Sequence, residues 1–212
     1  MDNKQLFENL NGIIKSIPLN DGNKKYLNII REPNKYAFHH SRPGKYNQAA
    51  EQNKGETAWQ RELYKKESGI WLDLELPIGQ YKPNGNRYTS LRVDLIGKKD
   101  GRFVLCELKQ TKDAGQPFDA ILQLIAYYVL LQNNYKKLDE QNIHHDNCNK
   151  DWTWEEVNNN PILLLRANDE YWKNWNKPTK KNMAARKIVE FCRENNIDIR
   201  LYCNEQEISI CE

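Results

Sequence analysis

The sequence is poor in apolar residues and contains no long apolar run, and each of these absences excludes a class of protein. Apolar residues make up 39% of the 212 positions, which suffices for the core of one domain but leaves a very polar surface. No stretch approaches the roughly 18 consecutive apolar residues of a membrane span, and the first residues lack the pattern of a secretion signal. We therefore expect a cytoplasmic protein that makes no contact with a membrane.

Clustered cysteines and a dominant charge are absent too. The five cysteines are scattered, and no two of them form a CxxC pair. Their odd number and wide spacing indicate neither a disulfide framework nor a zinc cluster. The formal net charge of +3 permits a polyanionic partner without requiring one, because a local basic patch matters more than the sum of charges.

The periodicity of apolar residues predicts helices that alternate with strands. Helices are expected over residues 6–17, 26–30, 49–67, 117–133 and 180–195. Strands are expected over residues 70–78, 89–99, 102–110, 161–166 and 197–203. Loops are expected in the segment that ends near residue 46 and in the polar segment 134–159.

The order of these elements predicts the fold. The helix 117–133 is apolar almost all round and should therefore be buried. Together with the strands before and after it, this helix forms a β-α-β unit, whose crossover is right-handed in nearly all proteins. We predict an α/β domain with a mixed central β-sheet flanked by helices over residues 49–212, preceded by an extension of helix and loop over residues 1–48.

Strand 70–78 has the alternation of a half-buried strand. Leu74 and Leu76 point to one face, and Asp73 and Glu75 point to the other. The two acids are therefore expected on the face that is turned away from the apolar core.

The next two strands flank the dipeptide Asp-Gly at 100–101, a strong signal for a hairpin with a two-residue turn. In such a hairpin Lys99 pairs with Arg102. Counting back along both strands places Asp94 opposite Glu107, with Cβ atoms about 5 Å apart on one face of the sheet. The sequence therefore predicts two facing carboxylates.

Facing carboxylates repel each other unless a cation neutralises them. Ligation by oxygen alone favours Mg²⁺ or Mn²⁺, and Lys109 projects from the same face because it is two residues beyond Glu107. Such a site can polarise a phosphoryl oxygen and activate water. The alternative is a solvated sheet face in which Lys109 is a salt-bridge partner. The flanking segments RVDLI and FVLCELK are apolar, however, and charges at the edge of a core need a reason.

The segment VDLIGKKDGRFVLCELK resembles the signature of the PD-(D/E)XK nuclease superfamily, with Val93 where proline often stands. The resemblance implies a restriction-endonuclease-like core, αβββαβ. It also implies Asp94, Glu107 and the backbone carbonyl of Leu108 as ligands of Mg²⁺ or Mn²⁺, and Lys109 as the catalytic lysine.

The buried helix carries a polar stripe that resembles the QxxxY element of the RecB-like branch of this superfamily. Gln123 and Tyr127 share a helix face, and Asp119 lies one turn earlier. The resemblance implies that this stripe faces the metal site. The alternative is a core glutamine with satisfied hydrogen bonds and, for Asp119, an acid that interacts favourably with the helix dipole.

The helix before the first strand contains Glu62, where the RecB-like branch often has a glutamate that approaches the metals. Glu56, two turns earlier, is the alternative. We favour Glu62 because its neighbours Trp59 and Leu63 place it near the boundary of the core. The resemblance covers roughly residues 55–130 and implies a metal-dependent nuclease, acting on DNA more readily than on RNA.

Two other functions remain open, namely a catalytically silent nucleic-acid-binding or assembly module on the same fold and a nuclease toxin or effector. A basic late helix with nearby tryptophans could hold phosphates and stack bases. The alternative, which we favour, is a solvated helix face with packing tryptophans. The residues concerned are Trp172, Trp175, Lys177, Lys180, Lys181, Arg186, Lys187 and Arg193.

Overall fold

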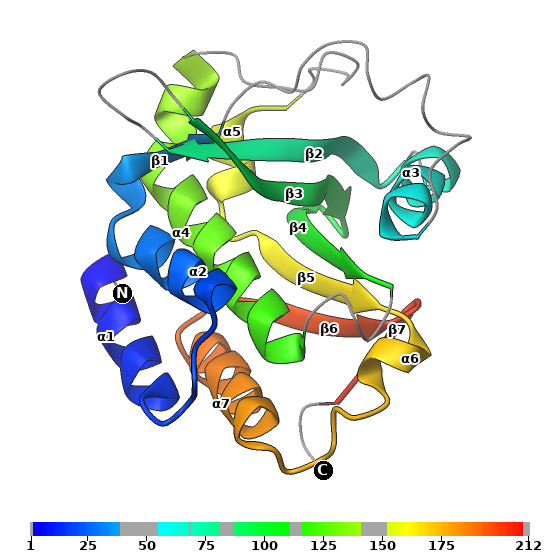
Figure 1. Ribbon diagram of the computed structural model, residues 1–212. Helices are drawn as coiled ribbons and strands as arrows, with labels where there is room; N and C mark the ends of the chain where they lie inside the picture. The colour runs from blue at the N-terminus through cyan, green and yellow to red at the C-terminus, as the bar shows by residue number, and fades with distance from the viewer. Residues whose placement is uncertain are drawn as a thin grey trace.

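The computed structural model describes residues 2–38, 55–67, 69–80, 87–110, 116–140 and 152–209. Figure 1 shows how their elements are arranged. The helices are α1 (Asn3–Ile14), α2 (Asp21–Arg31), η1 (Pro33–Lys35), α3 (Glu56–Lys66), α4 (Pro117–Glu140), α5 (Trp154–Asn158), α6 (Asp169–Trp172) and α7 (Lys180–Glu194). The strands are β1 (Tyr36–Phe38), β2 (Trp71–Gln80), β3 (Arg87–Lys99), β4 (Arg102–Lys109), β5 (Ile162–Ala167), β6 (Ile199–Cys203) and β7 (Gln206–Glu207).

One mixed sheet runs through the described part of the chain. Its seven strands there follow the chain order, β1 to β7. The pairs β1–β2, β2–β3 and β3–β4 are antiparallel. The pairs β4–β5 and β5–β6 are parallel, and β7 returns antiparallel to β6. The parallel pair β4 and β5 is connected through α4, as expected for the β-α-β unit. The predicted α/β class and mixed sheet are confirmed.

The hairpin between β3 and β4 has the predicted register. Lys99 pairs with Arg102, and the ladder continues to Leu95 and Cys106. The two turn residues have positive φ, 53° at Asp100 and 77° at Gly101, which a type I′ turn requires at both central positions. The chemistry of the turn therefore fixes which residues of β3 face which residues of β4.

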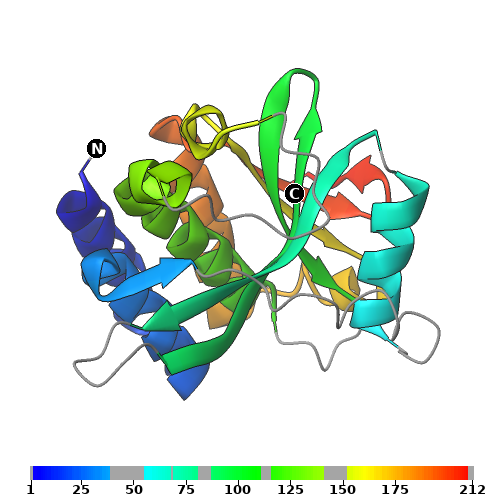
Figure 2. The ribbon, with the colours of Figure 1, turned by 90° about the horizontal axis from the view of Figure 1, so that it is seen from above.

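Helices cover the two faces of the sheet unequally. One face packs against α4, which α1, α2 and α7 cover in turn, and the other carries α3 (Figure 2). Helix α4 lies between the sheet and the outer helices, so that Phe118, Leu124 and Leu130 are all fully buried. This position explains the helix that is apolar almost all round. No helix in the described ranges combines the length and apolar character needed to cross a bilayer.

Two expected loops contain regular structure. In the segment 134–159, α4 continues to Glu140 because Asn134 and Leu138 still face the core. The Asp139 carboxylate then accepts hydrogen bonds from the backbone N–H of Trp154, at 2.6 Å, and from the next residue of α5. Residues 141–151 lie outside the described part. In the segment that ends near residue 46, β1 pairs with β2 and extends the sheet at its edge; residues 39–46 are not described.

The N-terminal residues belong to the same core as the sheet. Leu10 and Ile14 of α1 and Ile30 of α2 are buried in one cluster with Phe118 of α4. Strand β1 also joins the common sheet. Residues 2–38 are therefore an integral part of the folded body rather than an appended extension, and the expected boundary at residue 48 lies outside the described residues.

Candidate metal and catalytic site

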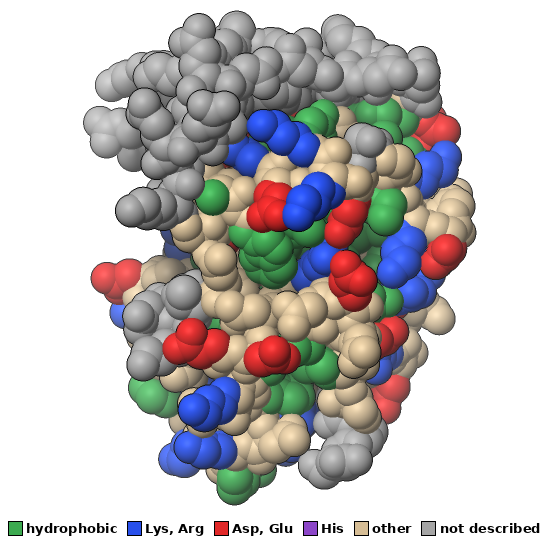
Figure 3. Space-filling model, turned by 90° about the vertical axis from the view of Figure 1, so that its right-hand side faces the viewer, with side chains coloured by type: hydrophobic (Ala, Val, Ile, Leu, Met, Phe, Trp, Pro, Cys, Tyr) green, Lys and Arg blue, Asp and Glu red, His purple; other side chains and the backbone are tan. Residues whose placement is uncertain are grey.

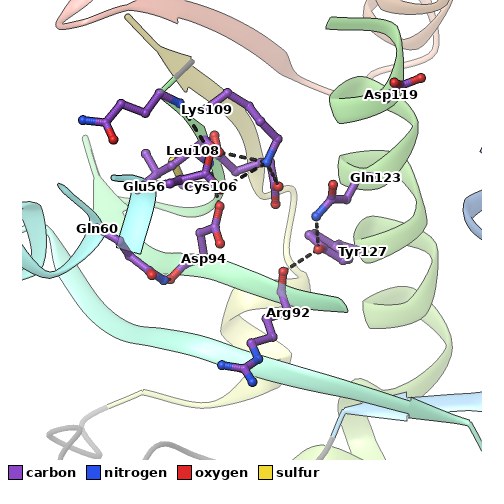
Figure 4. Close-up of polar contacts among 12 residues, drawn as sticks. Glu56, Gln60, Arg92, Asp94, Cys106, Leu108, Lys109, Asp119, Gln123 and Tyr127 are labelled. Carbon is purple, nitrogen blue, oxygen red and sulfur yellow. Dashed lines mark hydrogen bonds and ion pairs between the residues drawn. The ribbon is translucent and has the colours of Figure 1, made fainter. Parts of the chain in front are cut away.

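A pocket of about 480 Å³ opens where β3 and β4 separate, between α2, α3 and α4. Five carboxyl groups and two cations line it, namely those of Glu56, Glu75, Asp94, Glu107, Asp119, Arg92 and Lys109. Figure 4 shows Glu56, Asp94 and Lys109 converging from α3, β3 and β4, with Gln123 facing them from α4. The pocket thus collects more negative than positive groups.

Asp94 marks the point at which the hairpin ladder ends. The last paired residues are Leu95 and Cys106. One step further, the Leu108 N–H donates to Asp94 Oδ2 at 2.7 Å instead of to a backbone carbonyl. The Asp94 carbonyl accepts from the Gln60 side chain of α3. Because side chains replace the ladder here, the strands part, and the pocket forms between them.

Lys109 is the internal counter-charge of Glu107. Both residues are buried, since Lys109 is 7% and Glu107 is 2% exposed. Lys109 Nζ donates to Glu107 Oε1. The same ammonium donates to the Leu108 carbonyl at 2.9 Å and lies 3.7 Å from Glu56 Oε1. The other oxygen of Glu107, Oε2, is buried and has no hydrogen-bond partner among the described residues.

Burial and mutual repulsion perturb the carboxyl groups. Burial, followed by the charge of Asp94, raises the pKa of Glu107 well above its usual range. Burial raises the pKa of Asp94 to about 6, although the charge of Lys109 and the Leu108 N–H act in the opposite direction. Burial alone would lower the pKa of Lys109, but the nearby carboxylates of Glu107, Asp94 and Glu56 outweigh it and raise that pKa. One lysine therefore does not fully compensate the acids around it.

The donor set suits a hard divalent cation. Asp94, Glu107 and Glu56 offer carboxylate oxygens, the ligands that Mg²⁺ and Mn²⁺ prefer, and Glu107 Oε2 is a buried acceptor without a donor. Among the described residues, no three acidic, histidine or cysteine side chains are already arranged as a ligand cluster. The carboxylates are instead turned to Lys109 and to the Leu108 N–H, so ligation requires side-chain rotation.

Glu62 does not reach this pocket, which corrects the choice between the two glutamates of α3. Its side chain is 53% exposed, pairs with Lys66 and lines a different hollow. Glu56, in contrast, lies beside Lys109 and accepts from the Gln110 N–H at 3.3 Å. Six residues along an α-helix rotate a side chain by about 240°, so the two glutamates cannot face the same site.

The polar stripe of α4 approaches the pocket at Gln123 but not at Tyr127. Gln123 lines the pocket, whereas Tyr127 is fully buried behind it. Gln123 Nε2 donates to the Tyr127 hydroxyl, which in turn donates to the Arg92 carbonyl of β3 (Figure 4). Tyr127 therefore links Gln123 to β3 from behind the pocket.

Asp119 and the Leu108 carbonyl both have hydrogen-bond partners within the protein. Asp119 sits at the rim of the pocket, in the first turn of α4, where Oδ1 accepts from Asn23 Nδ2 at 2.6 Å and lies 3.9 Å from Lys181 Nζ. Its other oxygen, Oδ2, accepts from the Gln116 N–H at 3.3 Å at the start of the helix, which agrees with the expected alternative of a helix N-terminal acid. The Leu108 carbonyl, implied as a metal ligand by the resemblance, is held by Lys109 Nζ.

The sequence did not reveal Glu75 as part of the site. Its neighbours Leu74 and Leu76 pair with Leu95 and Val93, the residues on either side of Asp94. The ladder shifts register between Trp71 and Asp73, and Glu75 has a φ of 52°. The regular alternation assumed from the sequence therefore fails, and Glu75 is buried, with 6% exposure, at the pocket wall.

A usable signal for Glu75 was present in the sequence. Asp73 and Glu75 stand in an otherwise apolar strand, so the argument that charges at a core edge need a reason applies to them as well. The Asp73 carboxylate finds a partner close by in the sequence, because it accepts a hydrogen bond from the Leu74 N–H at 2.8 Å. The pocket residues of α2, Asn20, Asn23 and Tyr26, had no such signal, since only the folded chain brings α2 beside α4.

The late tryptophans and two of the late arginines serve packing. Trp172 and Trp175 are buried and in edge contact, with ring centroids 5.5 Å apart. Arg186 and Arg193 donate to the carbonyls of Trp175 and Ile199, each at 2.9 Å. The favoured alternative of packing tryptophans agrees with these contacts. On the face seen in Figure 3, acidic and basic side chains of the described residues are interspersed.

Comparison of the chain with family models, with curated proteins and with solved structures finds no match.

Proposed function

We propose that this protein is a metal-dependent phosphodiesterase that hydrolyses nucleic acid, and DNA more readily than RNA. The observation that carries the proposal is the buried carboxylate of Glu107. One of its oxygens is bound to Lys109, the other lacks a partner among the described residues, and Asp94 and Glu56 stand beside it in an open pocket. A buried carboxylate that a single lysine compensates only in part is costly, and a further cation would offset that cost.

The residues of the pocket would have different roles in hydrolysis. Asp94, Glu107 and Glu56 would hold Mg²⁺ or Mn²⁺, which when bound supplies Lewis-acid polarisation of the phosphoryl oxygen and a more acidic water. Lys109 would orient the attacking water through its ammonium or stabilise negative charge that develops on the phosphoryl group. Gln123 faces them across the pocket as a neutral donor.

The preference for phosphodiesters over other substrates rests on the resemblance of the hairpin to the PD-(D/E)XK signature. The combination that supports it is specific: both strand acids and the lysine of that signature line one pocket. The preference for DNA rests on the resemblance alone.

A cleavage assay tests the proposal. Wild-type protein is incubated with single-stranded DNA, duplex DNA and RNA, each with Mg²⁺, Mn²⁺ or EDTA. We expect cleavage that requires the metal and is lost in Glu107→Gln, which keeps the shape of the side chain but removes its charge. Glu62→Gln is the matched control, because it makes the same change on an exposed glutamate outside the pocket.

Two results would contradict the proposal. One is that no substrate is cut under any metal condition although Mn²⁺ binds, which would favour the silent binding module. The other is that Glu107→Gln cuts as fast as Glu62→Gln.

A further inference from the structure

Helix α2 lies along α4 and contributes polar side chains to the wall of the pocket (Figure 1). The Tyr26 hydroxyl donates to Gln123 Oε1 at 2.9 Å. One turn earlier, Asn23 Nδ2 donates to Asp119 Oδ1 at 2.6 Å. Both contacts join residues about 100 positions apart in the sequence, so α2 acts directly on the stripe of α4 that borders the site.

Tyr26, Gln123, Tyr127 and the Arg92 carbonyl form a series of hydrogen bonds. The direction of each bond can be worked out from the Arg92 carbonyl, where the series ends. The Arg92 carbonyl can only accept, so the Tyr127 hydroxyl must use its one proton there. The Tyr127 oxygen must then accept from Gln123, which places the nitrogen of the Gln123 amide toward Tyr127 and its oxygen away from it. That oxygen needs a donor, and Tyr26 supplies one.

With these directions, one N–H of the Gln123 amide has no role in the series of hydrogen bonds. The Gln123 nitrogen carries two protons, and only one is used by Tyr127. Gln123 itself lines the acid-rich pocket, and the described residues give its second N–H no acceptor. A rotation of the amide by half a turn would set its oxygen against the Tyr127 oxygen, whose proton is already given to the Arg92 carbonyl, so Tyr127 opposes that rotation. The Tyr26 hydroxyl binds the other end of the amide and holds that end in the pocket wall.

We propose that Tyr26 is a positioning residue of the site, which holds the Gln123 amide so that its second N–H is available to an oxygen of the bound phosphodiester or of the attacking water. The role in catalysis rests on the function proposed above. It extends the site to α2, which lies outside the part of the chain that resembles a nuclease.

Tyr26→Phe tests the proposal, because it removes the hydroxyl and keeps the ring. We expect kcat to fall about 3- to 10-fold, the effect of one hydrogen bond, while KM and Mn²⁺ affinity stay the same. Tyr128→Phe is the matched control, since Tyr128 is half-buried on α4, the helix of Gln123, and does not line the pocket. If Tyr26 acts through Gln123, then Tyr26→Phe has no further effect in a Gln123→Ala background.

Additive effects of the two substitutions would overturn the proposal, as would a loss in Tyr26→Phe no larger than in Tyr128→Phe. A second measurement does not depend on cleavage. The side-chain amide signals of Gln123 in ¹H–¹⁵N spectra, assigned by their disappearance in Gln123→Glu, should shift in Tyr26→Phe and not in Tyr128→Phe. Unchanged signals would overturn the proposal that Tyr26 positions Gln123. Shifted signals in a protein that cuts no nucleic acid would support the positioning by Tyr26 and would refute only the nuclease function.

Discussion

Replacing Asp94 by asparagine should stabilise the metal-free protein although Asp94 is a central site residue. Burial raises the pKa of this carboxyl from 3.8 to about 6. Above that pH the folded protein carries a carboxylate that is held less favourably than in the unfolded chain. Asparagine keeps the shape and an oxygen that can accept from the Leu108 N–H, but it carries no charge.

The size of the effect follows from the two pKa values. The difference between 3.8 and about 6 corresponds, at about 1.4 kcal/mol for each pH unit, to about 3 kcal/mol at neutral pH. The asparagine NH₂ needs acceptors of its own in this partly buried place, which offsets part of the gain. We therefore expect a net stabilisation of about 1–2 kcal/mol, or a rise in Tm of roughly 2–8 °C for a chain of this size.

The dependence on pH identifies the cause. Because the pKa in the folded state is the raised one, the folded protein binds more protons than the unfolded chain between 3.8 and about 6. The free energy of unfolding of wild type therefore falls as the pH rises through this window. Urea unfolding of wild type and Asp94→Asn in EDTA should show a clear difference at about pH 8 and a much smaller one at about pH 4.

Asp198→Asn is the control with the opposite sign. Burial acts to raise the pKa of Asp198, but hydrogen bonds from Arg200 and Arg102 outweigh it and lower that pKa. The substitution should therefore destabilise the protein at neutral pH. An Asp94→Asn variant that is destabilised like Asp198→Asn, or whose difference from wild type is the same at both pH values, would refute the reasoning.

Two further predictions concern metal and packing. Mn²⁺ at a hundredfold excess over Kd should raise the Tm of wild type and of Glu62→Gln by about 5–10 °C, and a Glu107→Gln variant with an equal rise would exclude Glu107 as a ligand. Gly97→Ala should cost about 1–3 kcal/mol in urea unfolding, because its Cβ would lie 2.6 Å from the Ile70 carbonyl oxygen. Gly12→Ala lies on α1, where no atom of the described residues comes within 4 Å of the added Cβ, and should instead stabilise by about 0.5–1 kcal/mol. Equal effects of the two alanines would show that the close approach at Gly97 is tolerated.

The parts of the site that could be predicted are those set by local rules. A turn with positive φ at Asp100 and Gly101 determines the register of the hairpin, and the two-residue period of a strand then carries Lys109 to the side of Glu107. No tertiary information is needed for these steps. The long apolar run of α4 likewise indicates a helix buried on all sides.

The parts that could not be predicted depend on how elements meet. The rotation of α3 about its axis decides between Glu56 and Glu62, and that rotation is set by contacts such as the one between Gln60 and the Asp94 carbonyl. The irregular backbone at Glu75 turns that side chain into the pocket against the simple alternation. Strand β1 has only three residues, too few for a sequence pattern, and is recognised by its pairing with β2.

If the proposed metal binds, the arrangement of Glu107 would let the lysine keep its place beside it. Lys109 binds Oε1 and offsets part of the charge of Glu107 through that single oxygen. The other oxygen, Oε2, is not needed for that pair. A carboxylate has lone pairs on both oxygens, and a divalent cation at Oε2 therefore need not displace the lysine from Oε1. The lysine would then stay beside the metal, where a group that orients water is required, instead of being released to solvent.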